Sequence, residues 1–373
     1  MSQRTLVAGT VGALVLAAVA ATPSAAAPAS HAAAHAASHT AASHTAYGSG
    51  GAVASVDANA SRIGLEVLRR GGNAADAAVA TASALGVTEP YSAGVGGGGY
   101  FVYYDARKNR VSTIDGRETA PAGITHDAFV DPSTGKPYPF TPQLVSSGVA
   151  VGVPGTPATW AAALKQHGTW SLARALKPSI SLARRGFTVD QTFRSQTLDN
   201  KARFSAFPAT ARLFLPGGDA PKVGTRFRNP ELATTLTSLA RRGTSAIYRG
   251  PVARDIVRTV QSPPKDPSSD LPAPAGSMTT ADLAGYRVRT AAPTHVSYRG
   301  LDVYGMGSSS SGGVAVGEAL NILENYRLGG GAALARSLHL YLEASARAFA
   351  DRNAYVGDPA YVPTPFRTLR SQR

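Results

Sequence analysis

The segment IDGRETAPAG, residues 114–123, carries the side chains best placed to do chemistry. A strand-like apolar run ends there in Asp115, Gly116, Arg117 and Glu118, and alanine, proline and glycine follow. Arginine presents a fixed fork of donors that fits a carboxylate with two hydrogen bonds. Arg117 is therefore a candidate for binding an anionic substrate group. A purely structural ion pair with Asp115 or Glu118 is the alternative that the same spacing allows.

Several other kinds of catalytic site are excluded or unsupported. The chain has no cysteine, which excludes disulfides, thiolate catalysis and cysteine-based metal sites. Neither a G-x-S-x-G elbow nor an H-E-x-x-H zinc motif occurs. The glycines Gly96–Gly99 resemble a phosphate loop only weakly, because no Lys-Ser/Thr follows and they lead into a strand. Close backbone packing at a strand entrance is the favoured interpretation of these glycines.

The pattern around Arg117 predicts a hairpin and two preceding helices. Residues 100–104 and 110–115 alternate about the turn DARKN, which places Arg117 just beyond the second strand. Upstream, SRIGLEVLRRGG predicts a helix that stops at Gly71–Gly72. Asn73 then resembles an N-cap, with Asp76 three residues later, before an alanine-rich second helix.

Further elements follow towards the C-terminus. Thr156 is the predicted N-cap of a helix, and KPSISLARRGF predicts another helix with Pro178 near its start. VSYRGLDVYGM predicts two strands, and residues 334–351 predict a helix whose inward side chains are Leu338, Leu342 and Phe349. This mixture of helices and strands places the chain in the α/β or α+β class.

Composition limits the class of protein and of partner. The 373 residues are 43% hydrophobic, which is typical of a folded protein with ample material for a core. The net charge is +14, but the arginines are scattered or in pairs, with no basic run of the kind found in nucleic-acid-binding tails. We therefore expect no nucleic-acid partner.

The N-terminus has the pattern of a secretory signal. Arg4 precedes a short apolar run and a small-residue region, so residues 1–27 are predicted to be a signal peptide cleaved near Ala27. The run is too short for a membrane span, and no cysteine is present for a lipid anchor. Residues 28–50, rich in alanine and histidine, are interpreted as a flexible linker rather than a metal-binding tract. The expected location is extracellular, or periplasmic if the source has an outer membrane.

Residues from about Gly51 to Pro365 resemble the gamma-glutamyltransferases, also called gamma-glutamyl transpeptidases or glutathione hydrolases. The resemblance rests on blocks in the family's order, including GGNAADAAVATASALGVTEP, GVGGGGYFVYY, IDGRETAPAG, GVAVGVPGTPATW, YRGLDVYGMGSSSSGG and ADRNAYVGDP. Residues 51–373 are accordingly interpreted as the large-subunit part of such a domain, truncated at its C-terminus.

The resemblance implies an α+β fold of the N-terminal-nucleophile hydrolase type, a four-layer αββα sandwich that is incomplete here without the small subunit. Family members are made as one precursor that cuts itself into two subunits. The new N-terminal threonine attacks the gamma-glutamyl amide of glutathione or a related compound, with its own amine as base. The acyl-enzyme then passes the glutamyl group to water, an amino acid or a peptide. No cofactor and no metal are implied.

The same resemblance assigns a role to Arg117. In the family, the arginine of the block matching GRETAPA binds the alpha-carboxylate of the glutamyl group. Glu118 is then the residue expected to orient Arg117 from behind. No catalytic residue is assigned within the chain.

The family's nucleophile block, T-T-H-x-S or T-S-H-x-S, has no full match. The nearest segment, PTHVS at residues 293–297, has Pro293 where the threonine should be, so Thr294 is expected to be part of a strand. The nucleophile is therefore expected beyond Arg373, which makes the chain a fragment or a truncated product that is inactive alone. A related acylase acting on another carboxylate-bearing amide, such as a glutaryl side chain, and a non-catalytic secreted binding remnant are the alternatives.

Overall fold

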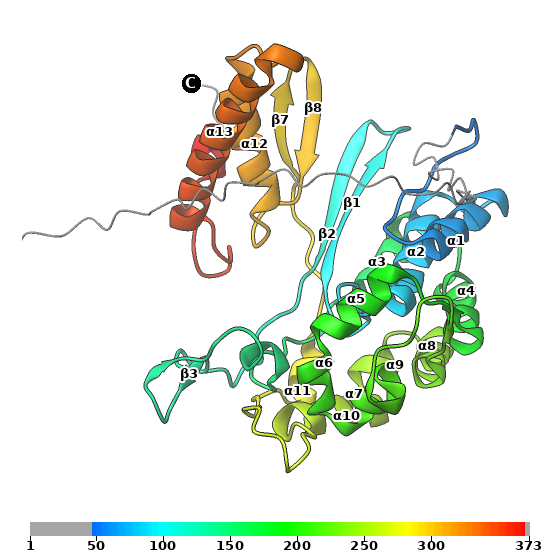
Figure 1. The fold of residues 1–373 in the computed structure, drawn as a ribbon. Helices are drawn as coiled ribbons and strands as arrows, with labels where there is room; N and C mark the ends of the chain where they lie inside the picture. Colours follow the sequence, from blue (N-terminus) through cyan, green and yellow to red (C-terminus); the bar gives the residue numbers. More distant parts are fainter. Residues whose placement is uncertain (1–46, 370–373) are drawn as a thin grey trace, which may run out of the picture. The chain divides into compact units, whose positions relative to one another are not determined.

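Residues 47–369 are described by a computed structural model (Figure 1). The predicted signal peptide, residues 1–27, lies outside the described residues, as do residues 28–46 of the predicted linker and residues 370–373. The elements described below belong to the unit Gly48–Arg373.

The first two helices form where the sequence predicts them. Helix α1, Ala58–Arg69, starts after the N-cap Asp57. Helix α2, Ala74–Thr88, starts after Asn73, and Asp76 completes a reciprocal capping box with that residue. Because α2 is rich in alanine, it packs closely against both α1 and α4 (Leu172–Arg185).

Asp76 also fixes a distant loop. Its fully buried carboxylate accepts hydrogen bonds from the backbone N–H of Asn73, from the backbone and hydroxyl of Thr169, and from the backbone of Trp170, at 2.6–3.2 Å. Burial raises the pKa of this carboxyl, but the hydrogen bonds from Thr169, Trp170 and Asn73 outweigh it and hold the pKa below its ordinary value. One carboxylate thus ties the start of α2 to the loop before α4.

Asp76→Ala is expected to lower the free energy of unfolding by about 3 kcal/mol, because several buried donors lose their acceptor together. Urea denaturation followed by circular dichroism measures this loss. Asp255→Ala is the matched control, since Asp255 forms only an exposed ion pair with Arg258 and should change stability by less than about 1 kcal/mol. Equal effects of the two substitutions would contradict the proposed role of Asp76.

Two helix starts differ from the sequence prediction. Helix α3, Thr156–His167, has Gly155 as its N-cap, so Thr156 is the first helical residue rather than the cap. Helix α4 begins after Ser171, whose side chain accepts a hydrogen bond from the backbone of Arg174. Pro178 therefore lies inside α4 and not near its start. The Ser171 cap satisfies a backbone N–H in the first turn of α4, so the helix begins before Pro178. The position of the proline alone does not indicate this earlier start.

The middle segment continues with helices α5 to α11. Helix α8 lies against α4, and their buried side chains join those of α2 and α3 in the main hydrophobic core. The bounds are α5 Gln191–Asp199, α6 Lys201–Ser205, α7 Pro208–Phe214, α8 Pro230–Arg242, α9 Ser245–Tyr248, α10 Gly250–Gln261 and α11 Thr280–Gly285.

The strands of the described residues form four antiparallel pairs. Strands β1 (Gly99–Asp105) and β2 (Arg110–Gly116) make the predicted hairpin, and β7 (Thr294–Tyr298) and β8 (Leu301–Gly305) make the predicted second pair. The short pairs are β3 (Val130–Asp131) with β4 (Lys136–Pro137) and β5 (Phe187–Thr188) with β6 (Arg226–Phe227). The mixed helix and strand content agrees with the α+β prediction. Within residues 47–369, however, two-stranded pairs stand where a four-layer sandwich would have two larger sheets.

In the C-terminal helices, the buried side chains differ from those predicted from the sequence. Helix α12, Gly312–Glu324, packs on β7 and on α13, Leu334–Tyr355. The predicted inward residues of α13 are wrong: Leu338, Leu342 and Phe349 are 51%, 63% and 57% exposed. The buried face of α13 consists of the small residues Ala344 and Ala348, which allow close packing. A short helix, α14 (Phe366–Leu369), follows.

Candidate active site

Arg117 leaves the end of β2 at a tightly packed corner. A side chain on Gly116 would collide with the Thr159 hydroxyl of α3, and one on Gly155 would collide with the Gly116 carbonyl. Only glycine therefore lets β2 approach the start of α3 so closely. The backbone of Arg117 is held on both sides: its N–H donates to Asp115 Oδ1 at 2.9 Å, and its carbonyl accepts from Tyr286 Oη at 2.8 Å.

Among residues 47–369, the guanidinium of Arg117 has one hydrogen-bond partner, and that partner is neutral. Nη1 donates to Tyr100 Oη at 3.2 Å, and Tyr100 Oη lies 3.3 Å from Ser309 Oγ. No carboxylate of residues 47–369 forms an ion pair with Arg117. Contact with Tyr100, and then the charges of Glu118 and Asp115, raises the pKa of Arg117. The arginine is thus charged, exposed and available to an anion.

Neither neighbouring carboxylate holds the Arg117 guanidinium in an ion pair. Asp115 uses its carboxylate to accept from the backbone of Arg117, not from the guanidinium. Glu118 makes no hydrogen bond to that guanidinium among the described residues, although its charge is near enough to affect the arginine. The orienting role of Glu118 remains a prediction for the substrate complex, and in this structure the residue that contacts the guanidinium is Tyr100.

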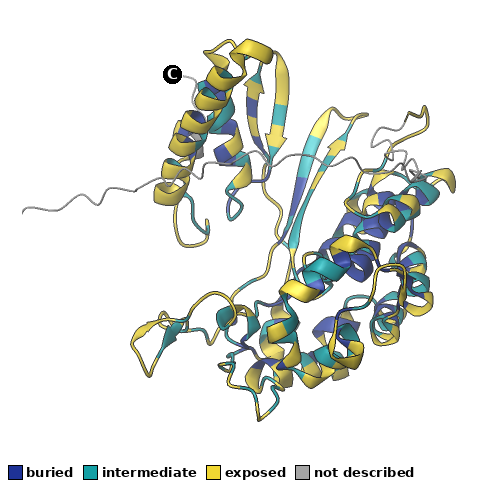
Figure 2. Cartoon of the chain, in the orientation of Figure 1, coloured by how far each residue is buried: buried dark blue, intermediate teal, exposed yellow. Residues whose placement is uncertain are grey.

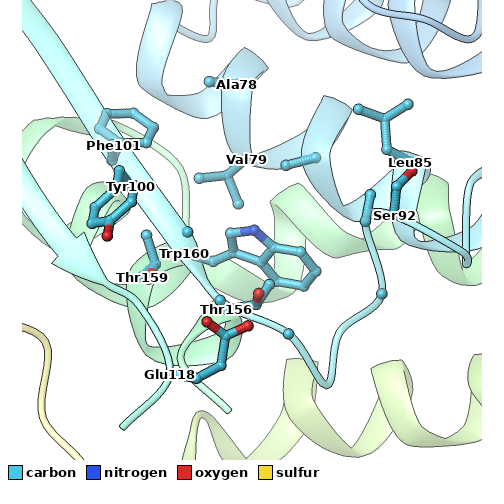
Figure 3. A pocket seen from close by; sticks show the side chains of 16 residues that line it. Ala78, Val79, Leu85, Ser92, Tyr100, Phe101, Glu118, Thr156, Thr159 and Trp160 are labelled. Carbon is cyan, nitrogen blue, oxygen red and sulfur yellow. The ribbon is translucent and has the colours of Figure 1, made fainter. Parts of the chain in front are cut away.

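Arg117 and Glu118 line one cavity of about 560 Å³, together with Gly96, Thr119 and Phe129. Glu118 also lines a second cavity of about 400 Å³, where Trp160 and Thr156 form part of the wall (Figure 3). The first cavity is large enough for a small-molecule ligand. The structure therefore brings Arg117 and Glu118 together in the 560 Å³ cavity. Glu118 lines both this cavity and the 400 Å³ cavity.

The glycines before β1 make room for Glu118. A Cβ on Gly98 would lie 2.8 Å from the Glu118 carboxyl carbon. The Gly97 carbonyl accepts from the backbone of Gly155 at 2.9 Å and of Thr156 at 3.0 Å, which joins this loop to the start of α3. The prediction of close backbone packing is confirmed for Gly97 and Gly98, whereas a side chain on Gly96 or Gly99 would meet open space.

Thr294 is confirmed as a strand residue. It starts β7, is 4% exposed, and its hydroxyl would collide with any side chain on Gly313. A substrate amide has no access to such a hydroxyl. Thr294 is therefore not placed to act as a nucleophile in this structure.

Tyr100 was missed in the sequence analysis although a signal was present. The predicted hairpin implies that its first strand residue pairs with its last, and the structure pairs Tyr100 with Asp115. Since Tyr100 pairs with Asp115, its side chain lies close to Arg117, two residues further along the chain. Tyr286 carried no comparable signal, because it reaches the corner from a segment far along the chain.

The described residues contain no group of three or more histidine, aspartate or glutamate side chains arranged to hold a metal ion. The histidine tract at His31, His35, His39 and His44 lies outside the described residues. None of the described helices is long and apolar enough to cross a membrane.

A family model described as gamma-glutamyltranspeptidase matches residues 60–373. The chain belongs to this family. The glutathione hydrolase proenzyme of Bacillus subtilis (strain 168) is 38% identical over 330 residues, which cover 86% of this chain and 53% of the relative. The acylase ACY 1 proenzyme of Pseudomonas sp. (strain V22) is 36% identical over 328 residues, covering 87% of this chain and 57% of the relative.

The fold of this gamma-glutamyltranspeptidase family member is similar to a solved structure as well. The crystal structure of Helicobacter pylori gamma-glutamyltranspeptidase superposes with a TM-score of 0.80 at 33% identity, covering 88% of this chain and 90% of that one. The chain spans about half the length of the curated relatives it matches.

Proposed function

We propose that this chain forms the carboxylate-binding part of a secreted enzyme that transfers the gamma-glutamyl group of glutathione and related amides. The acceptor is water, an amino acid or a peptide, and the intermediate is a threonine acyl-enzyme. The observation that carries the proposal is the Arg117 guanidinium, which is exposed at a cavity, held by Tyr100, and without an ion-pair partner among residues 47–369.

The geometry of Arg117 suits the alpha-carboxylate of a glutamyl group. One nitrogen is oriented by Tyr100, and the remaining donors can hold a carboxylate with two charge-assisted hydrogen bonds. Because the backbone on both sides of Arg117 is also hydrogen-bonded, little freedom remains to be lost on binding. The arginine thereby positions the gamma-amide for attack by the nucleophile of a second polypeptide segment.

Exposed apolar surface supports a second, smaller subunit as the partner. In Figure 2 much of α13 is exposed, and its large side chains include Leu334, Tyr341 and Leu342. The outer edge of β2 is bridged at one point, between Asp115 and Arg289, but no further strand of residues 47–369 pairs with either main hairpin. Such surfaces are usually covered in a finished protein. We propose that strands of the small subunit add to these pairs and complete the four-layer αββα sandwich.

A related acylase activity is the second candidate, and the similarity to an acylase proenzyme favours it. Arg117 accounts for a carboxylate but not for an alpha-amine. The two activities are separated by comparing a gamma-glutamyl anilide with a glutaryl anilide on the precursor that contains this chain. A higher kcat/KM for the gamma-glutamyl compound supports the proposed function. A higher value for the glutaryl compound would overturn it in favour of the acylase.

Tyr100→Phe, in that precursor, is expected to raise KM for the gamma-glutamyl anilide about fivefold with little change in kcat, because one hydrogen bond that orients Arg117 is lost. The ring, and hence the strand packing, is kept. Tyr104→Phe is the matched control, since Tyr104 lies on the same strand and its hydroxyl donates to Asn109 Oδ1 at 3.0 Å, away from Arg117. Steady-state kinetics of both variants decides the matter, and an unchanged KM for Tyr100→Phe would argue against this orienting role.

Export is part of the proposal and rests on the sequence of residues 1–27. The mature N-terminus is expected between about Ala25 and Ser30, the range indicated by the small-residue region. Mass spectrometry of material recovered outside the cell measures it directly. Extracellular protein that still begins with Met1 would contradict cleavage by a signal peptidase.

A further inference from the structure

We propose that the cleft between α1 and α4 binds a small organic polyanion with a flat apolar body. The cleft has a volume of about 570 Å³, within the range of small-molecule sites. It shares no lining residue with the cavity of Arg117, so the inference does not depend on the gamma-glutamyl activity.

Positive charge dominates the rim of this cleft. One carboxylate, Glu66, faces five cationic side chains, which are Arg62, Arg70, Arg174, Lys177 and Arg185. Glu66 is already paired with Arg70 at 2.6 Å. Among the described residues, the side chain of Arg62 donates to the neutral Asn59 Oδ1, at 3.3 Å, and to no carboxylate.

Within residues 47–369, the other cations of the rim have no ion-pair partner. These cations are Arg174, Lys177 and Arg185. Residues 1–46 contain no aspartate or glutamate, so that segment brings no carboxylate either. An anion that enters between α1 and α4 relieves the repulsion among these cations.

The floor of the cleft is apolar and well fixed. Ile63, Val67 and Leu182 line it, together with the buried ring of Trp170. The Arg174 guanidinium lies 3.8 Å from the centre of that ring, a cation–π contact that holds a donor above an aromatic surface.

Trp170 is itself held by the buried carboxylate of Asp76, through its backbone N–H at 2.9 Å. The site is therefore largely preformed. A flat ligand body can lie against Ile63, Leu182 and the Arg174 guanidinium that covers Trp170, while its acidic groups reach the cations of the two walls.

The trianion 8-hydroxypyrene-1,3,6-trisulfonate is a suitable probe, because it combines a flat aromatic body with three sulfonates and its fluorescence anisotropy reports binding to the purified full chain. Saturable binding is expected. Arg62→Gln with Lys177→Gln removes one cation from each wall and should weaken binding about 10-fold. The matched control is Arg69→Gln with Arg184→Gln, which removes the same charge from exposed positions of the same helices that do not line the cleft.

Each outcome of this experiment supports or overturns the site. Loss of affinity in the cleft variant, with the control within about twofold of the parent chain, supports it. Equal losses in the two variants would reduce the binding to general surface charge. Absence of saturable binding, or displacement by inorganic sulfate at the concentration at which the probe itself binds, would overturn the proposal. Circular dichroism of each variant confirms that the fold is retained.

Discussion

Arg117→Lys, introduced into the precursor that carries this chain, is expected to raise KM for a gamma-glutamyl anilide by about 10- to 100-fold. Lysine keeps the positive charge but loses the planar fork that holds a carboxylate at two points. Loss of a charge-assisted hydrogen bond corresponds to about 1.5–3 kcal/mol. Since the alpha-carboxylate is distant from the scissile bond, most of the effect should fall on KM rather than on kcat.

The matched control for this variant is Arg110→Lys. Arg110 is exposed at the opposite end of the same strand, β2, and has no side-chain partner among the hydrogen bonds of the described residues. Its substitution should leave both kinetic constants unchanged. If Arg117→Lys behaves like Arg110→Lys, the arginine has only a structural role.

Residues 28–373 purified alone are expected to release no chromophore from a gamma-glutamyl anilide and to undergo no self-cleavage. The sequence contains no full match to the family's nucleophile block, and Pro293 occupies the first position of the nearest match. Thr294 is buried in β7 and closely packed against Gly313. Binding of a carboxylate by Arg117 without a nucleophile gives no acyl-enzyme.

A continuous precursor that adds a matching small-subunit sequence should restore both activities. The two proteins are assayed side by side at equal concentration, with release of the anilide followed by absorbance. Turnover by residues 28–373 that disappears in a Thr294→Ala variant would contradict the expectation, because it would make Thr294 the nucleophile.

Local rules predicted the elements around the site well. The capping box of Asn73 and Asp76, the hairpin that ends before Arg117 and the strand pair of VSYRGLDVYGM each depend on residues close together in sequence. The capping box joins residues three positions apart, and the first hairpin starts from a turn between Asp105 and Arg110, so the sequence pattern is sufficient to find both.

Features that depend on distant contacts were not predictable in the same way. The apolar side of α13 was expected to face the core, but a periodic pattern shows only that one face is apolar, not what covers it. Leu338 and Leu342 are exposed, and helix α12 packs on the alanine face instead. The hydrogen bond from Tyr286 to the Arg117 carbonyl likewise joins residues 169 positions apart, beyond the reach of any local rule.

The assignment of Arg117 to the substrate carboxylate is tested most directly by a pair of anilides, gamma-glutamyl and its analogue without the alpha-carboxylate. The specificity constant kcat/KM is measured for each on the parent precursor and on Arg117→Lys. The predicted result is a loss of about 10-fold or more for the gamma-glutamyl compound and almost none for the analogue, which has no group for Arg117 to hold. Equal losses for the two anilides would show that the substitution damages the site in general, and would contradict binding of the carboxylate by Arg117.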